Sequence, residues 1–296
     1  MIADKRLNEV FRSAPAIDFD DSAKFIFFSD VHRGDNTAAD DFAHNQMLYF
    51  HALKRYYDEG FTYIEIGDGD ELWENAKFED IRQAHSHIFW LMSQFYGQKR
   101  LYLIWGNHDR QRKNPKWVEQ NLYHYFDERS GNREPLFPGI QIHEGLILRH
   151  VNSEKKIHLV HGHQGQLLND SLWWIGRFFV RNLWRPFQLI GAKDPTSPAK
   201  NYRTRQKVER QLSDWAKRNG QLIIAGHTHR PVFPKAGEAP YFNDGSCVHP
   251  RCITGIELLG EEIALIKWLV NIKDDGTLFV DREVLEGPER WIEYCG

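Results

Sequence analysis

Cysteine is scarce in this chain of 296 residues. Three are present, Cys247, Cys252 and Cys295, and their number and spacing exclude a disulfide framework and a thiolate zinc site. We expect free thiols in a reducing cytoplasm. The first residues lack the apolar core of a secretory signal, and no run approaches the roughly 18 apolar residues that span a bilayer. These absences predict a soluble, cytoplasmic protein.

An excess of positive charge is also missing. The formal net charge is −3, so broad electrostatic capture of nucleic acid is not expected and no nucleic-acid partner is predicted. Residues 165–211 are the exception, with nine Lys or Arg against three Asp or Glu, a local charge of +6. This segment alone keeps a nuclease or nucleic-acid-binding function open as an alternative.

Hydrophobic residues make up 41% of the chain, and their spacing predicts a layered α/β (α+β) protein. The chain shows no internal repeat or clear linker, so residues 1–296 are predicted to form a single domain. From Tyr241 onward the pattern favours a β-meander or hairpins. Helices are expected at 40–57 and 79–96, and strands at 24–28, 63–66, 101–105, 146–151, 157–160 and 222–225.

Polar clusters stand at the ends of five of these strands. In layered α/β folds ligands bind beyond the carboxyl ends of the strands, so we expect the clusters to converge. They are Ser29-Asp30-Val31-His32, Gly67-Asp68, Gly106-Asn107-His108-Asp109, His161-Gly162-His163 and Gly226-His227-Thr228-His229.

The clusters supply the donors that two neighbouring divalent cations require, namely carboxylates, an amide oxygen and imidazoles. Asp30 and His32 are two residues apart, as are His227 and His229, so each pair can present two ligands on one side of an extended or loop segment. The glycines before Asp68 and Asn107 allow a tight turn where a Cβ would crowd the cations.

Taken in order, and with Glu71 completing the second cluster, these motifs resemble the five signature blocks of calcineurin-like metallophosphoesterases over about residues 25–231. The resemblance implies a four-layer α-β-β-α sandwich of two facing mixed sheets. It also implies two divalent metal ions, with Mn²⁺ expected and Fe or Zn²⁺ as alternatives. In this arrangement Asp68 bridges both ions, one of which is also held by Asp30, His32 and His229 and the other by Asn107, His161 and His227.

The activity that follows is hydrolysis of a phosphoester. A hydroxide shared by two cations is nucleophilic at neutral pH and would attack phosphorus in line. His108 is predicted to give a proton to the leaving oxygen or to stabilise transition-state charge. Either Glu71 or Asp109 would orient the His108 ring, and the sequence leaves this choice open.

Several residues near these motifs are candidates for substrate binding. Arg33 and Arg110 each follow a ligand block and are predicted to bind a substrate phosphate through the guanidinium fork, with solvated surface positions as the alternative. His163 is predicted to line the pocket.

An insertion separates the last two histidine clusters and is longer than a connection between strands requires. We predict a helical cap over residues 165–215. Arg177 and Arg181 lie one helical turn apart within the Trp- and Phe-rich stretch 171–191 and are predicted to bind substrate. This stretch could make a peripheral membrane contact or enclose an acyl chain, or it could be a helix buried against the domain.

The spacing GD-x-x-E-x-W in residues 67–73, together with residues 226–231, is similar to UDP-2,3-diacylglucosamine pyrophosphohydrolases, which also carry a basic, apolar lid. The substrate is therefore expected to be a phosphate-containing small molecule or a lipid-linked one. A Ser/Thr-type protein phosphatase, a cyclic-nucleotide or nucleotide phosphodiesterase, and a non-catalytic metal-binding interaction module are the alternatives.

Overall fold

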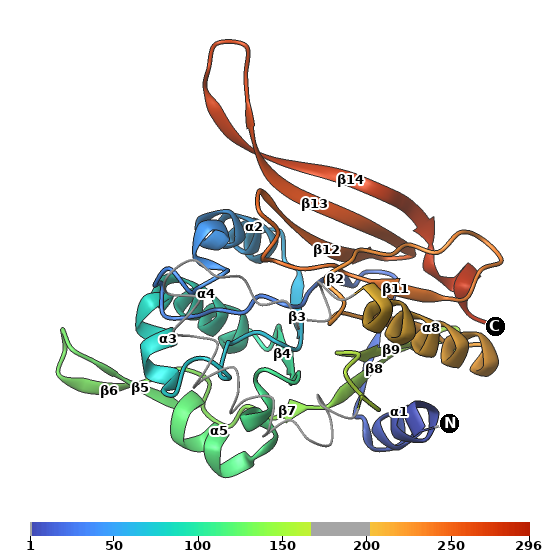
Figure 1. Ribbon diagram of the computed structural model, residues 1–296, viewed down its shortest axis with the longest axis horizontal. Coiled ribbons are helices and arrows are strands. Elements are labelled where there is room, and N and C mark those ends of the chain that lie inside the picture. Colours follow the sequence, from blue (N-terminus) through green and yellow to red (C-terminus); the bar gives the residue numbers. More distant parts are fainter. Residues whose placement is uncertain (1, 167–201) are drawn as a thin grey trace.

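The computed structural model describes residues 2–166 and 202–296 and has the predicted four-layer α-β-β-α architecture (Figure 1). Its larger sheet has seven strands. In spatial order these are β14 (Leu278–Arg290), β13 (Glu262–Ile272), β12 (Cys252–Leu259), β2 (Lys24–Phe28), β3 (Thr62–Ile66), β4 (Leu101–Ile104) and β7 (Ile142–His143).

The second sheet has five strands and packs face to face with the first. Apolar side chains of both sheets meet between them, among them Phe27 and Ile64 from one and Leu159 and Ile224 from the other. The strands in spatial order are β1 (Ala16–Phe19), β8 (Gly145–His150), β9 (Lys156–Val160), β10 (Leu222–Ala225) and β11 (Tyr241–Asn243).

Parallel pairing places the carboxyl ends of the central strands at one edge of the sandwich. Strands β2, β3 and β4 are parallel neighbours in one sheet, and β9, β10 and β11 are parallel neighbours in the other. All six are almost wholly buried, because helices cover the outer face of each sheet. This is why they read in the sequence as continuous apolar runs.

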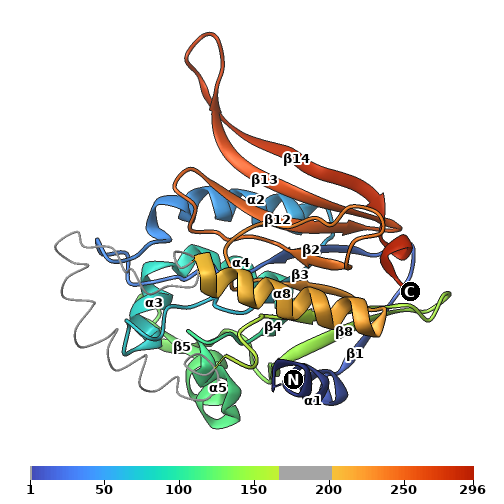
Figure 2. The same ribbon diagram turned by 45° about the vertical axis from the view of Figure 1, so that its right-hand side comes forward.

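Helices form the outer layers. The seven-stranded sheet is covered by α2 (Gln46–Asp58), α3 (Phe78–Ala84), α4 (Ser86–Gly97) and α5 (Pro115–Leu122). The five-stranded sheet is covered by α1 (Ile2–Ser13) and α8 (Tyr202–Asn219), which lie side by side (Figure 2). Short 3-10 turns occur at η1 (Ala43–Asn45), η2 (Arg110–Lys113) and η5 (Trp291–Tyr294).

The helix predicted at 79–96 is wrong as a single element. It is divided into α3 and α4 at His85, where the backbone leaves the helical region and the buried ring is hydrogen-bonded to Asp40 at 2.9 Å. The helix predicted at 40–57 begins later, at Gln46, after η1.

The predicted cap needs a correction at its C-terminal part. Residues 202–215 belong to α8, which buries Val208, Leu212 and Trp215 and contacts β10 and β11. These residues therefore form a flanking layer of the sandwich. The rest of the predicted cap, including the membrane-contact stretch 171–191 with Arg177 and Arg181, lies outside the described residues.

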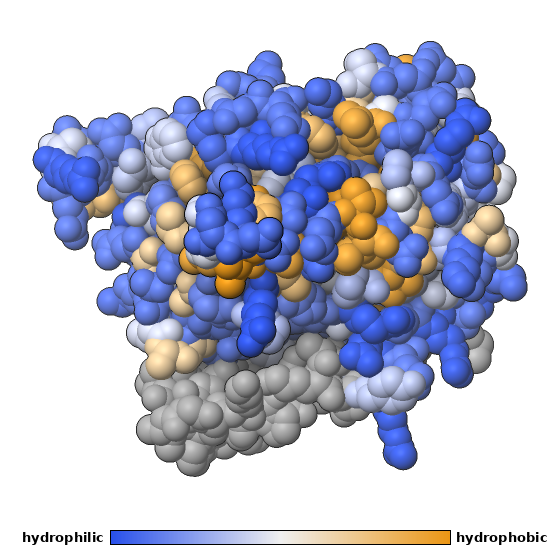
Figure 3. All heavy atoms as spheres, turned by 90° about the horizontal axis from the view of Figure 1, so that it is seen from above, coloured by the Kyte–Doolittle hydropathy of each residue, from blue (hydrophilic) through white to orange (hydrophobic). Residues whose placement is uncertain are grey.

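Two hairpins extend from the sandwich (Figure 1). One joins β5 (His124–Asp127) to β6 (Asn132–Pro135), and the other is the far end of β13 and β14, which exposes Val270, Ile272 and Leu278. Seen from above, apolar patches are scattered over a mostly hydrophilic surface (Figure 3). Among the described residues, no helix is both long and apolar enough to cross a bilayer.

Candidate metal centre

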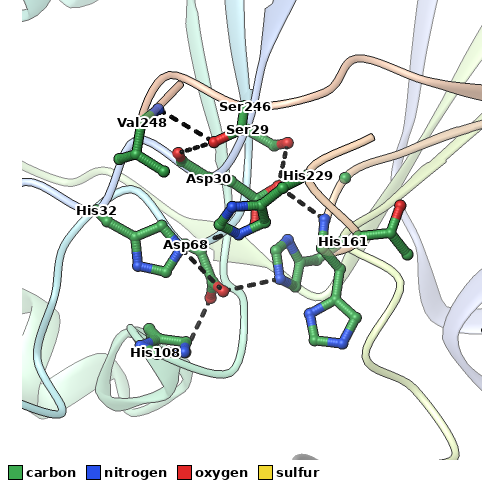
Figure 4. A network of polar contacts seen from close by, with 12 residues as sticks. Ser29, Asp30, His32, Asp68, His108, His161, His229, Ser246 and Val248 are labelled. Atoms are coloured by element: carbon green, nitrogen blue, oxygen red, sulfur yellow. Dashed lines mark hydrogen bonds and ion pairs between the residues drawn. The ribbon is translucent and has the colours of Figure 1, made fainter. Parts of the chain in front are cut away.

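Loops that follow β2, β3, β4, β9 and β10 bring the predicted ligands together at one edge of the sandwich. Figure 4 shows five of them close to one another, namely Asp30, His32, Asp68, His161 and His229. One group of potential ligands is Asp30, His32 and His229, and another is Asp68, His161 and His227. Within each group the ligand atoms lie within 4.8 Å of one another. The seventh predicted ligand, Asn107, adjoins them, because the next residue donates its backbone N–H to the Asp68 carboxylate at 2.8 Å.

The two groups touch each other through His32. Its Nε2 is 3.8 Å from Asp30 Oδ1 and 3.8 Å from Asp68 Oδ2. His229 Nε2 lies 3.0 Å from the same oxygen of Asp30, and His161 Nε2 lies 3.0 Å from the same oxygen of Asp68. The two groups are therefore close enough together to form one continuous set of potential metal ligands.

In Asp30, His32 and His161, hydrogen bonds occupy one side of the side chain and leave one potential metal-binding atom without a hydrogen bond, whereas His227 Nε2 is in contact with Gln166 at 2.8 Å. Asp30 uses Oδ2 to accept from the His227 N–H at 2.7 Å. His161 Nδ1 is bonded to the Ile66 carbonyl at 2.9 Å, and His32 Nδ1 to Glu71 at 2.7 Å. These bonds require a proton on Nδ1, or a protonated ring, so that in the neutral tautomer Nε2 carries a lone pair.

The atoms that remain are buried without a hydrogen-bond partner among the described residues. They include Asp30 Oδ1, His32 Nε2, Asn107 Oδ1 and His161 Nε2. Burying a polar atom without a partner is costly, so a set of such atoms in one place needs an explanation. All four belong to predicted ligands and their chemistry suits divalent transition metals, so the residues fit a bound pair of cations.

The ligand loops hold a strained backbone. Asp30, His32, Asp68, His227 and His229 have φ angles of 49°, 50°, 51°, 70° and 54°. Such left-handed conformations are uncommon outside glycine and persist where the surroundings enforce them, often at functional sites. The two Asp-x-His and His-x-His pairs therefore lie in loops and not on extended strands.

Gly67 and Gly106 lie where the sequence predicted close approaches. A Cβ on Gly67 would be 2.7 Å from the His161 ring, and one on Gly106 would be 2.1 Å from Asp68 Oδ1. Gly67 also has a φ of +81°. Only glycine fits at these positions without displacing a ligand.

Burial and neighbouring charges shift the pKa of the ligands. Burial raises the pKa of Asp68, but His161 and His108 outweigh it and hold the pKa well below its usual range. Burial lowers the pKa of His161, whereas Asp68 and Asp30 raise it to about 9. For His227, burial and the adjacent His161 lower the pKa to about 3. The Asp68 carboxylate is thus ionised. Of Asp68, His161 and His227, only His161 carries a proton that a cation must displace.

Glu71 lies between His32 and His108. Its Oε2 is bonded to His32 Nδ1 at 2.7 Å and its Oε1 to His108 Nδ1 at 2.8 Å. These three residues also form a third group of potential ligands, but both Nδ1 atoms are already engaged by the carboxylate, which makes a hydrogen-bonded relay the better description. Glu71, and not Asp109, orients His108.

His108 is held from a second side by Trp73. The two rings are stacked with centroids 4.3 Å apart and planes 19° apart, and the indole N–H donates to the Asn107 carbonyl at 2.6 Å. Burial lowers the pKa of His108, but Glu71 and Asp68 outweigh it and raise the pKa above its ordinary value. The side chain is 21% exposed, so its outer edge is accessible.

Two predicted roles near the site are contradicted. Arg33 is fully buried and bonded to Glu65 and Asp70, so its guanidinium is not available to a substrate phosphate. Asp109 is also fully buried, and its carboxylate accepts from the backbone of Gly106 at 2.6 Å and of Gly69 at 3.0 Å. Sequence position does not reveal the burial that decides both cases.

The remaining predicted substrate contacts lie beside the second ligand group. His163 is fully buried, with its ring 5.5 Å from His161 and 5.4 Å from Trp105. Arg110 is only partly buried, and its guanidinium lies over the Trp105 ring at 5.5 Å. Their role as pocket residues stays a prediction.

One further loop contributes residues that the motifs did not identify. Ser29 Oγ is 2.5 Å from Asp30 Oδ2 and 2.6 Å from Asp244 Oδ1, in the loop after β11. Burial raises the pKa of Asp244 well above its usual range. Ser246 donates to the Asp30 carbonyl at 3.1 Å. A signal was present in the sequence, because Asp244-Gly245-Ser246 comes just after the apolar residues Tyr241 and Phe242, within the β-rich segment predicted from Tyr241 onward.

No curated protein matches the sequence at a significant level. Among solved structures, Vps29 of Chaetomium thermophilum is 11% identical, with a TM-score of 0.39 over 90% of this chain and 97% of that one. The sulfate thiohydrolase SoxB of Thermus thermophilus is also 11% identical, with a TM-score of 0.30 over 93% of this chain and 59% of that one. Residues 23–231 match the family described as calcineurin-like phosphoesterase, and the chain belongs to that family.

Proposed function

We propose that this chain is a phosphoester hydrolase that works with two divalent cations. The observation that carries the proposal is the set of buried oxygen and nitrogen atoms on Asp30, His32, Asn107 and His161 that have no hydrogen-bond partner among the described residues and that lie where two ligand groups adjoin. Family membership supports the same chemistry. A domain that served only to bind a partner protein would not need to leave these four buried atoms without hydrogen bonds.

Cations bound there would lower the pKa of a water molecule and neutralise phosphate oxygens. The chain itself supplies orientation and a proton. Glu71 fixes His108 through Nδ1, which leaves Nε2 as the atom that can give a proton to the leaving oxygen. The stacked Trp73 ring restricts rotation of the imidazole.

The proposal extends to phosphoester and diphosphate bonds in general. Recognition of a UDP-sugar lipid would depend on the Trp- and Phe-rich stretch 171–191, which lies outside the described residues. A lipid-linked diphosphate, a cyclic nucleotide and a phosphoprotein therefore enter the test as separate substrates.

The test is a panel of an aryl phosphomonoester, an aryl phosphodiester, cyclic AMP, a phosphopeptide and UDP-2,3-diacylglucosamine, assayed after metal removal and again with Mn²⁺. We expect hydrolysis of at least one substrate with Mn²⁺ and none after metal removal. Calorimetry on the metal-free protein should give two equivalents of Mn²⁺ per chain. Absence of both metal binding and hydrolysis would refute the proposal.

A further inference from the structure

Five charged side chains form a buried cluster next to the loops that carry the predicted ligands. None of the five belongs to the two ligand groups or to the hydrogen-bonded set of Glu71, His32 and His108. Arg33, Glu65, Asp70, Asp109 and Arg112 are each 0% to 1% exposed. We call this set the buried charge cluster. The cluster consists of two guanidinium groups and three carboxylates. Charged groups are the most costly groups to bury unless they are paired with one another.

Both arginines are paired with carboxylates, although Arg112 Nε is buried without a hydrogen-bond partner among the described residues. Arg33 uses Nε for Asp70 at 2.7 Å and its two terminal nitrogens for Glu65 at 2.7 and 2.9 Å. Arg112 contacts Glu65 at 3.0 Å, Asp109 at 3.1 Å and Asp70. Glu65 is held by both terminal nitrogens of Arg33, whereas Asp70 contacts one nitrogen of each arginine and Asp109 one nitrogen of Arg112. A planar guanidinium that holds several carboxylates in this way restricts their positions more than a single ammonium would.

The members of the cluster are interleaved with the ligands along the chain. Arg33 follows His32 directly, Asp70 stands two residues after Asp68, and Asp109 stands two residues after Asn107. The loops are also tied through their backbones, since the N–H of His32 donates to the Asp68 carbonyl at 2.9 Å and that of Arg33 to the Gly69 carbonyl at 3.0 Å. The cluster therefore joins the three ligand loops of the seven-stranded sheet.

These loops need such support because their backbone is strained. His32 and Asp68 both hold a left-handed φ, a conformation that persists only where surrounding contacts enforce it. A buried ion-pair network adds little net stability compared with apolar packing, so its value lies in fixed geometry. Groups that orient metal ligands commonly change metal affinity by about 10- to 100-fold when they are altered.

We propose that the buried charge cluster is a positioning device for the metal centre. It fixes the loops of Asp30 and His32, of Asp68 and of Asn107 relative to one another and contacts neither cation nor substrate. Because it concerns the geometry of the same ligands, the inference rests on the proposed function.

The test is Arg33→Lys, which keeps the positive charge but cannot hold Glu65 and Asp70 together. Arg282→Lys is the matched control, because Arg282 forms a fork with Glu257 that joins β14 to β12, away from the ligand loops. Calorimetry with Mn²⁺ measures metal affinity, and thermal unfolding of the metal-free proteins measures stability. We expect affinity to fall at least tenfold in Arg33→Lys and to stay within twofold in Arg282→Lys. The loss of stability should be larger in Arg33→Lys, because that side chain is fully buried whereas Arg282 is 24% exposed.

Glu65→Gln provides a second variant that keeps the side-chain shape, and we expect a similar loss of affinity. Unchanged affinity in folded Arg33→Lys and Glu65→Gln would overturn the positioning role while leaving the proposed function intact. Unfolding of both variants, with a folded Arg282→Lys, would also overturn it and assign the cluster to the fold alone. Failure of the wild-type protein to bind Mn²⁺ would instead refute the proposed function.

Discussion

At the scale of single residues, Glu71 is hydrogen-bonded to two histidines with different predicted roles, one a metal ligand and the other a proton donor. One carboxylate oxygen holds His32 so that its Nε2 faces the ligand group, and the other holds His108, which has no place in the two ligand groups assigned to cations. One side chain thus aligns a ligand and a proton donor. This link explains why the carboxylate is fully engaged and why its pKa falls to about 2 despite burial, through the effect of His108 and His32.

His108→Asn removes the proposed proton donor and should leave metal binding unchanged. We expect kcat for an alkyl phosphoester to fall by about 10² or more, the usual range for general acid catalysis. A p-nitrophenyl ester should lose much less, because its leaving group needs no proton. Steady-state kinetics on both esters, with calorimetric metal affinity as the control, provide the measurement. Equal losses on the two esters would argue against proton donation.

Asp68→Asn tests the bridging position. The substitution keeps the size of the side chain but removes the negative charge that lies within 3.8 Å of both His161 and His32 nitrogens. We expect both cations to be lost at Mn²⁺ concentrations that saturate the wild-type protein, together with all hydrolysis. Asp58→Asn, an exposed position paired with Lys54 on α2, is the control and should bind two equivalents. Retention of one tightly bound cation in Asp68→Asn would show that this residue does not bridge.

At the scale of elements, the ligands depend on how each loop leaves its strand. Gly67 and Gly60 offer a matched pair, because their φ angles are +81° and +82°. A Cβ on Gly60 meets no described atom within 4 Å, whereas one on Gly67 would meet the His161 ring at 2.7 Å. Gly60→Ala should therefore lower the free energy of unfolding by about 1 to 2 kcal/mol through backbone strain alone, with normal metal affinity.

Gly67→Ala should cost more stability than Gly60→Ala and should also displace His161. We expect at least a tenfold loss of Mn²⁺ affinity in this variant alone. Chemical denaturation and calorimetry on both proteins give the comparison. If the two variants bound Mn²⁺ equally well, the close approach of Gly67 to His161 would not be required for metal binding.

Some helices and strands could be predicted from the sequence and others could not. Buried parallel strands are apolar on both faces, so β2 and β10 were found with their correct bounds, and so was the edge where ligands gather. The division of the helix at His85 depends on a contact with Asp40, 45 residues away, and local periodicity cannot reveal it. The exclusion of Arg33 from the substrate pocket likewise depends on Glu65, 32 residues away.

At the scale of the whole molecule, the metal centre spans both sheets. Asp30, Asp68 and Asn107 come from the seven-stranded sheet, and His161 and His227 from the five-stranded sheet. Cations bound here would hold the two layers together and would bind only the folded chain. Mn²⁺ at about 100 times its dissociation constant should therefore stabilise the fold by about 2.7 kcal/mol for each site.

The size of this stabilisation should depend on pH, with a sign set by His161. In the metal-free protein its pKa is raised from 6.5 to about 9, because Asp68 and Asp30 outweigh the effect of burial. This protonation stabilises the metal-free fold below pH 6.5, and the contribution is lost as the pH rises through 9. A cation needs the neutral imidazole and must displace the proton, so metal affinity should increase with pH over this window.

Thermal unfolding at a fixed Mn²⁺ concentration between pH 6.5 and 8.5 measures this linkage. We expect the rise in melting temperature caused by Mn²⁺ to become larger as the pH increases. If one proton is displaced, the Mn²⁺ affinity should increase by up to about tenfold per pH unit. Asp68→Asn should show no Mn²⁺-dependent shift at any pH in the series, because it lacks the carboxylate that we propose to bridge the cations. A shift that stayed constant or shrank toward pH 8.5 would mean that His161 is not the group the cation deprotonates.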